Sequence, residues 1–551
     1  MNIRALLTLA LLLGVGYFVA TTRINYVPID APFMSWIPFG YWFLVVLVVI
    51  LAVTVVREDN PKNWNFAVDL ALLAVLFFGP ELMENSVRVR DSFSFLYVVN
   101  YVINPSNYHQ ISYPLVNYLQ NWPGFFYTIG SLYLVTGFTY YVGAKVTFVI
   151  IQLVMLLLSF ALGRTIFGNK RGSILMGLIV TAINWDVWVT ISPVMFGEVL
   201  LLAFVIVMCR GFQKKPEVIM LTIIILAATI THGLTSLIFI SIVVVTPLVS
   251  QLVGTLVARF DSRLGGKATS LFEFQRLVPS IPISLVCVLA FAIWFLLEPS
   301  AINRGNLLEA FDFALHAGVT PLTYQLSYLT PGRYYSVITA AIYLVILACW
   351  AAILVLLTVR AKERIVAYPI VLLLVAIVTT YLFAPVSQDF YDRLFQNGFP
   401  FIAIFLVSSI MKLRNKWKAV TMVFLAALLF SGFVAAFSHE AVLIYPQTEV
   451  AGDAFVSNLV PTDTLVAYPS AGPTLQSLAD ARQGPVVLYL LPAGNETLFH
   501  QELVLSTAVV DSLVVANSLD YYYGNSHLSN YENVTFFNRV YDSGSFKLYV
   551  K

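Results

Sequence analysis

The chain has 551 residues, of which 59% are hydrophobic and only 11% are charged. A soluble protein is nearer half apolar and a quarter charged, so this composition excludes an ordinary soluble enzyme and indicates a polytopic membrane protein. No basic stripe with interleaved aromatic residues occurs, and we expect no nucleic-acid partner. The cysteines Cys209, Cys287 and Cys349 show neither a metal-type spacing nor a disulfide framework.

Apolar runs of near-spanning length recur from the N-terminus to residue 437. The first, in "MNIRALLTLALLLGVGYFVATTR", is long for a signal peptide and no clear A-x-A site follows it, so we expect a retained helix. Thirteen such runs predict membrane-spanning helices: 4–22, 39–56, 65–80, 143–163, 172–190, 194–209, 216–231, 234–257, 277–297, 336–358, 365–384, 396–411 and 419–437.

The segment 122–141 is a fourteenth candidate, and the distribution of positive charge decides against it. With a cytoplasmic N-terminus and thirteen spans, the inner loops hold twenty of the 31 lysines and arginines and the outer loops hold seven. A further span at 122–141 would break this bias toward the cytoplasmic side. We therefore expect this aromatic segment to form a helix along the outer membrane surface, and the tail after residue 437 to lie outside.

The outer loop after the third span, 81–142, is long and begins with a concentration of charge. Its first part, "ELMENSVRVRDSFSF", carries two glutamates, two arginines and an aspartate: Glu81, Glu84, Arg88, Arg90 and Asp91. A loop of this length inside a compact domain is usually functional. The alternative is that the charges merely mark the membrane boundary as a solvated face.

Other outer loops also carry ionisable residues at the depth of the membrane surface. Such groups are costly there unless they face a cavity or a partner, so together they predict one polar cavity open to the outside. Each also has a plain alternative, since Glu198 and Arg393 could form surface ion pairs and a lone histidine is more often an interface residue than a catalyst. The candidate cavity residues are Glu198, His232, Arg333, Asp389, Asp392 and Arg393.

The composition changes after Phe437. The runs "TLVAYP", "PVVLYLLP", "SLVVANS" and "FKLYVK" read as strands, and the segments "PTLQSLADAR" and "ETLFHQELVLSTA" between them read as helices. Residues 438–551 are thus predicted to form a small extracytoplasmic α/β domain. Asn495 and Asn533 stand in glycosylation sequons on the side assigned as external.

The order of features from 81 to 143 resembles that of the polytopic glycosyltransferases of type C (GT-C), which include protein mannosyltransferases, aminoarabinose transferases and catalytic subunits of oligosaccharyltransferase. The resemblance rests on Asp91 in "VRVRDSFSFL", followed by "SYPLVNYLQNWPGFFYTIGSLYLVTG" and then a span. It implies a GT-C-like transmembrane domain over 1–437. The chain departs from the family in having two spans before the helix that leads into the charged loop, and in lacking a strict DxD there.

The resemblance implies a sugar donor carried on a polyprenyl phosphate and a glycan or protein acceptor at the external face of the cell membrane. Arg88, Arg90, Arg333 and Arg393 are then the candidate phosphate ligands, because a guanidinium binds phosphate bidentately. Asp91 is the first candidate for the general base and Glu84 the second. No metal ligand is assigned, and a divalent cation is left open. A transporter or flippase of lipid-linked saccharide is the main alternative, and a membrane scaffold that presents the tail is another.

Overall fold

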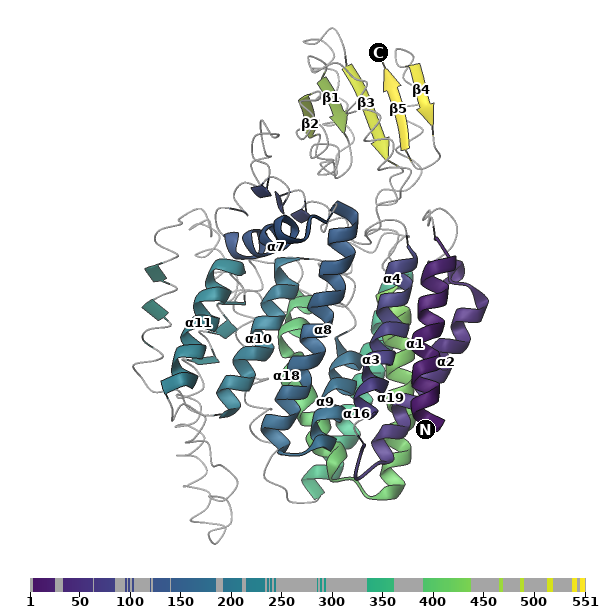
Figure 1. Cartoon of the computed structure of the whole chain (residues 1–551), viewed down its shortest axis with the longest axis vertical. Coiled ribbons are helices and arrows are strands. Elements are labelled where there is room, and N and C mark those ends of the chain that lie inside the picture. The colour runs from purple at the N-terminus through teal and green to yellow at the C-terminus, as the bar shows by residue number, and fades with distance from the viewer. Residues whose placement is uncertain are drawn as a thin grey trace, which may run out of the picture.

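The computed structural model describes most of the helical part of the chain. The described residues are 3–24, 33–62, 64–84, 122–138, 140–184, 192–210, 215–232, 334–360, 390–437, five strands between 465 and 550, and isolated residues within 95–119, 235–243 and 285–293. These residues form a bundle of long helices and a separate sheet (Figure 1).

The first three expected spans form the N-terminal part of the bundle. Helices α1 (Ile3–Thr21) and α2 (Phe39–Thr54) are followed by α3 (Asn65–Leu73), the π-helical turn η3 (Ala74–Phe78) and α4 (Gly79–Met83). The short 3₁₀ turns η1 (Phe33–Trp36) and η2 (Val55–Arg57) flank α2. The third helix thus continues to Met83, three residues beyond the expected end at 80.

Seven further long helices complete the bundle in the described part of the chain: α8 (Tyr140–Phe167), α9 (Lys170–Ile183), α10 (Pro193–Arg210), α11 (Lys215–Thr231), α16 (Tyr334–Arg360), α18 (Phe390–Met411) and α19 (Asn415–Ala436). With the first three, they overlap ten of the thirteen expected spans. The segment 365–384 and most of 234–257 and 277–297 lie outside the described residues, so the total of thirteen stays a prediction.

The bundle has the length and composition of a multi-pass membrane protein. Six described helices are long and apolar enough to cross a bilayer: Ile3–Thr21, Phe39–Arg57, Asn65–Met83, Val142–Phe167, Pro193–Arg210 and Asn415–Ala436. Large apolar side chains such as Leu13, Phe43 and Leu157 are exposed on their outer faces, where lipid would cover them.

The doubtful segment 122–141 forms a short helix across one end of the bundle. Helix α7 (Pro123–Thr136) lies over the ends of α8, α10 and α11 and runs roughly across them (Figure 1). Its 14 residues span about 21 Å, less than the roughly 30 Å of a bilayer core. Gly137 ends it in the left-handed conformation, with φ 65°. We call this end of the bundle the α7 end.

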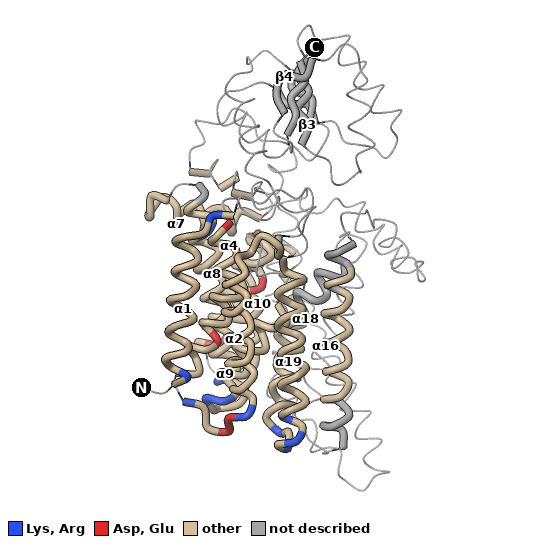
Figure 2. Tube along the Cα trace, turned by 90° about the vertical axis from the view of Figure 1, so that its right-hand side faces the viewer, with Lys and Arg blue, Asp and Glu red and all other residues tan. Residues whose placement is uncertain are grey.

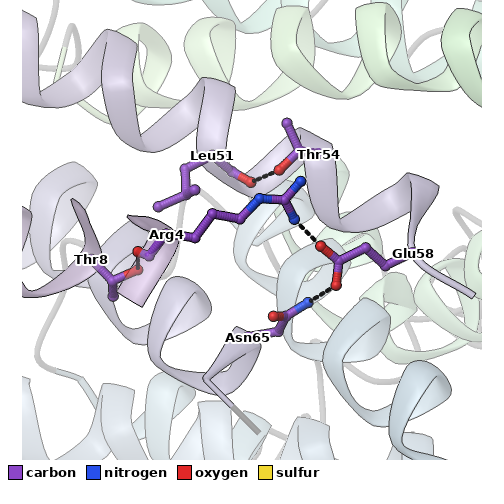
Figure 3. Close-up of polar contacts among 6 residues, drawn as sticks. All are labelled: Arg4, Thr8, Leu51, Thr54, Glu58 and Asn65. Atoms are coloured by element: carbon purple, nitrogen blue, oxygen red, sulfur yellow. Dashed lines mark hydrogen bonds and ion pairs between the residues drawn. The ribbon is translucent and has the colours of Figure 1, made fainter. Parts of the chain in front are cut away.

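Charged residues gather at the opposite end, which we call the Arg4 end (Figure 2). Arg4 forms an ion pair with Glu58, and Asn65 donates a hydrogen bond of 2.7 Å to the second oxygen of the same carboxylate (Figure 3). Nearby, Asp59 contacts Arg171 of α9 and Lys418 of α19, each at 2.8 Å. The hydrogen bond from Lys418 lowers the pKa of Asp59. These contacts tie α1, α3, α9 and α19 together at one level.

Glycines allow the hairpin of α8 and α9 to pack closely. A Cβ atom placed on Gly163 would lie 2.4 Å from the backbone oxygen of Gly172. Because backbone atoms cannot turn aside as a side chain can, this position admits only glycine without movement of the two helices.

Gly163→Ala is therefore expected to lower the free energy of unfolding by about 1–3 kcal/mol, measured as thermal unfolding in detergent. Gly16→Ala on α1 is the control, because a Cβ there meets nothing within 4 Å. That variant should be unchanged or more stable, since alanine favours a helix. Equal stability of the two variants would contradict close packing at Gly163.

The C-terminal part contains a five-stranded mixed sheet in the order β2-β1-β3-β5-β4. Strand β1 (Leu465–Tyr468) pairs in parallel with β2 (Val486–Tyr489) and β3 (Leu513–Ser518), and β5 (Phe546–Val550) pairs antiparallel with β3 and β4 (Asn538–Asp542). Four strands lie in the four expected runs, and β4 was not expected. The segments expected to be helical lie outside the described residues, so the complete α/β domain stays a prediction. The sheet lies beyond the α7 end (Figure 1).

Candidate functional site

Several of the residues singled out from the sequence lie outside the described residues: Arg88, Arg90, Asp91, Arg333, Asp389, Asn495 and Asn533. Asp392 and Arg393 lie in the first turn of α18, and their side chains are not described. The described candidates are Glu81, Glu84, Glu198 and His232, and all four are buried.

Glu81 and Glu84 lie where the third span reaches the α7 end. Their exposed fractions are only 2% and 1%. The turn that precedes them is π-helical, and the hydroxyl of Tyr41 on α2 donates a 2.7 Å hydrogen bond to the carbonyl of Val75 within it. Tyr41 thus fixes the direction in which the chain reaches the two glutamates. Glu81 and Glu84 are therefore not part of a solvated face, which was the alternative considered for this charged stretch.

The backbone at Glu84 is held by neighbouring segments. Ile24, just after α1, pairs with Glu84 in a parallel bridge and donates its N–H to the Met83 carbonyl at 2.9 Å. Lys145 of α8 donates to the carbonyls of Glu81, at 3.1 Å, and Glu84. Three helices therefore meet where the long loop begins.

Glu198 lies in the second turn of α10 at the same end of the bundle. Asn184, at the C-terminal end of α9, donates a 3.1 Å hydrogen bond to its carboxylate, and both side chains are buried. The sequence left open that Glu198 forms an ion pair at the surface. The structure instead shows one of its carboxylate oxygens accepting a hydrogen bond from the end of the neighbouring helix α9.

His232 follows the C-terminal end of α11. Its Nδ1 lies 2.9 Å from the hydroxyl of Thr235. A Cβ atom on Gly197 would lie 2.4 Å from that same hydroxyl, so Thr235 packs against α10 next to Glu198. A Cβ atom placed on Gly124 of α7 would lie 2.7 Å from the hydroxyl of Thr231, the last residue of α11.

Aromatic rings close the space between these helices. Phe125 of α7 packs against Phe95 and Phe126, and against Phe196 of α10 at a ring-centroid distance of 6.2 Å. The α7 end therefore combines buried carboxylates, a histidine and an apolar wall. Such a combination suits a site that binds an amphipathic ligand and moves a proton.

Among the residues that the structure describes, no group of three His, Cys, Asp or Glu side chains is arranged to hold a metal ion. The charged loop 85–94 lies outside these residues.

Two residues of this arrangement, and one residue elsewhere in the bundle, were not selected from the sequence. Asn184 and Lys145 bond to candidate site residues, but amide and lysine side chains near apolar runs carry no distinctive pattern. Asp69 did carry a signal, because it is the only charge within the run 65–80 and a charged residue inside a span is rare unless it has a function.

Asp69 is fully buried in α3, one turn after Asn65. Neither of its carboxylate oxygens has a hydrogen-bond partner among the described residues. Gly177 of α9 makes room for it, since a Cβ there would lie 3.0 Å from Asp69 Oδ2. Burying a polar group without a partner costs free energy.

Asp69→Leu, which keeps the shape and removes both oxygens, is expected to raise the free energy of unfolding by about 1–3 kcal/mol. Asn65→Leu is the matched control, because Asn65 is equally buried but bonded to Glu58, and it should lower stability. Thermal unfolding of both variants in detergent tests this. A loss at Asp69→Leu as large as at Asn65→Leu would show that Asp69 has a stabilising partner.

Comparison with known proteins gives a clear result for the fold. No protein-family model and no curated protein sequence matches the chain. The structure of ArnT from Cupriavidus metallidurans bound to undecaprenyl phosphate is similar, with a TM-score of 0.51 at 14% identity, over 88% of this chain and 97% of that chain. The apo state of ArnT gives a TM-score of 0.50 over the same shares, also at 14% identity.

An oligosaccharyltransferase from Archaeoglobus fulgidus, in complex with Zn and sulfate, aligns with a TM-score of 0.47 at 12% identity, over 86% of this chain and 68% of that chain. The similarity to the two ArnT structures shows that the chain has a GT-C-like fold, as the resemblance in sequence order implied.

Proposed function

We propose that this protein is a membrane glycosyltransferase that moves a sugar from a polyprenyl-phosphate donor to a glycan or protein acceptor at the external membrane surface. The observation that carries the proposal is the burial of Glu81, Glu84 and Glu198 at one end of a bundle with a GT-C-like fold. The similar ArnT structure contains undecaprenyl phosphate, which supports a lipid-phosphate donor for this chain too.

In the proposed reaction an acceptor oxygen or nitrogen attacks the anomeric carbon of the sugar, and the bond from that carbon to the phosphate oxygen breaks. The acceptor proton passes to a carboxylate, with Asp91 as the first candidate and Glu84 as the second. Arg88, Arg90, Arg333 and Arg393 neutralise the phosphate that leaves. Glu81, Glu198, His232, Asp389 and Asp392 line the cavity.

We assign the α7 end to the outside of the cell and the Arg4 end to the cytoplasm. The gathering of lysines and arginines at the Arg4 end supports this orientation (Figure 2). The tail, 438–551, is then extracytoplasmic, and Asn495 and Asn533 are accessible to glycosylation. Single cysteines introduced at 108 and in the tail should react with a membrane-impermeant reagent from outside, and reaction only from the cytoplasmic side would reverse the orientation.

The test of the function is transfer in a purified system. The protein in detergent or vesicles is given a polyprenyl-phosphate sugar with a radiolabelled sugar and an extracted pool of acceptors. Label should move to the acceptor with release of the polyprenyl phosphate. Movement of the intact lipid-linked sugar across vesicles without release of phosphate would instead support a flippase.

A further inference from the structure

The end of α4 lacks the usual means of ending a helix. A helix leaves its last four carbonyls without partners inside the helix, and many helices satisfy them with a glycine in the left-handed conformation. Here the residue after α4 is Glu84, which is extended, with φ −69° and ψ 139°. The partners of these carbonyls must therefore come from elsewhere.

Two other segments supply the donors for four successive carbonyls. Lys145 of α8 donates to those of Glu81 and Glu84. The segment after α1 provides the other two contacts, with the guanidinium of Arg23 at 3.5 Å from the Leu82 carbonyl and the N–H of Ile24 at 2.9 Å from that of Met83. Carbonyls 81 to 84 are thus all bonded by the segment just after α1 and by α8.

Charge makes this arrangement favourable. The C-terminal end of a helix carries partial negative charge, and cations near it are stabilising. Lys145 is half-buried at the start of a membrane span, where a cation without partners would be costly. The carbonyls at the end of α4 offset the cost of placing the Lys145 cation there, and the hydrogen bonds from Lys145 in turn hold the end of α4 in position.

We infer that Arg23, Ile24 and Lys145 form a clamp on the end of α4 that positions the start of the 81–142 loop for catalysis. Lys145 is the positioning residue of this clamp, because among the described contacts it bonds both the first and the last carbonyl of the four-residue segment. The catalytic role in this inference rests on the proposed function, whereas the clamp itself rests on the described contacts. It also gives a role to α1, one of the two spans that precede α3, since α1 carries Arg23 and Ile24 to the start of the loop.

The clamp is tested by hydrogen exchange and by steady-state kinetics on the full-length protein. Lys145→Met keeps the length of the side chain and removes the charge. It should speed exchange of the Ile24 and Glu84 amides about tenfold, because their hydrogen bonds lie within the clamp. It should lower kcat for sugar transfer by roughly 10–100-fold while KM for the donor stays within about twofold, since misplacing a reacting group costs rate rather than binding.

Lys145→Arg should restore both readouts, because it keeps a cation at the same place. Lys416→Met, an exposed lysine at the Arg4 end, is the matched control and should change neither. If Lys145→Met does not fold, Arg23→Met acts on the same helix end from an exposed side chain and should give a smaller change of the same kind.

The outcomes separate the clamp from the proposed function. Unchanged exchange in Lys145→Met overturns the clamp. Faster exchange with normal kcat overturns the positioning role and leaves only a structural contact. Faster exchange in a protein whose wild type transfers no sugar supports the clamp and overturns the glycosyltransferase proposal.

Discussion

Replacing Asp91 with asparagine is expected to slow sugar transfer by roughly 10²–10⁴-fold, which is the usual contribution of a general base. Asparagine keeps the shape of the side chain but cannot accept the acceptor's proton. Asp91 stands in the first long outer loop, three and one residues after Arg88 and Arg90. Arginines close to the carboxylate would favour its ionised form, which is the form a base needs. Folding and donor binding should remain nearly intact.

Glu84→Gln is the comparison for Asp91→Asn. Glu84 begins the same loop but is held at its backbone in a buried position, and its replacement should have the smaller effect if it serves the structure. Nearly normal turnover in Asp91→Asn with a strong loss in Glu84→Gln would assign the base to Glu84. Normal turnover in both variants would show that the charged stretch does not carry the chemistry.

Replacing Arg393 with alanine is expected to weaken donor binding by on the order of 2–3 kcal/mol, the cost of losing a charge-assisted hydrogen bond to phosphate. Helix α18 begins three residues before Arg393, and its other end leads through Lys412 to α19 and the Arg4 end. Arg393 therefore lies toward the α7 end, on the same side as Glu84 and Glu198. Binding of the donor to the folded variant, measured directly, gives the effect.

Two further variants define the role of Arg393. Arg393→Lys should restore binding only in part, since lysine keeps the charge but not the planar fork. Arg414→Ala removes an arginine at the Arg4 end and should leave donor affinity unchanged. Unchanged donor affinity in Arg393→Ala would show that Arg393 does not bind the donor phosphate. It would then favour the alternative considered from the sequence, a surface ion pair.

The helical part of the fold followed from the sequence because a bilayer imposes simple rules. A span must be long and apolar, and its flanking charges report the side of the membrane, so α7 could be separated from the spans although it is also rich in apolar residues. The π-helical turn η3 could not be foreseen, because it depends on Tyr41 from another helix. Strand β4 was missed, although "NRVYDSGSFKLY" has the turn residues of a hairpin between two β-prone runs.

The candidate site was predicted less completely than the fold. The glutamates at 81, 84 and 198 could be selected because charge is scarce in apolar surroundings, and all three lie buried at the α7 end. Their partners Asn184 and Lys145 could not, since a contact between residues 61 positions apart, as for Lys145 and Glu84, depends on how the helices pack. The spacing of residues in the sequence predicts side-chain contacts only within a single helix, where residues three or four positions apart are neighbours.

The packing of α19 against the N-terminal helices has a consequence for biosynthesis. Trp42 of α2 packs on Phe433 at 5.7 Å, Phe77 stacks with Phe437, and Asp59 bonds Lys418 at 2.8 Å. The ribosome makes these partners more than three hundred residues apart. A nascent chain that has inserted α1 to α3 therefore has one apolar face uncovered until α19 is inserted, although Asp59 can already pair with Arg171 once α9 is made. Insertion of α19 would then be the step that completes the packing of the N-terminal helices. Chains that end before Arg414 should be degraded early by membrane quality control.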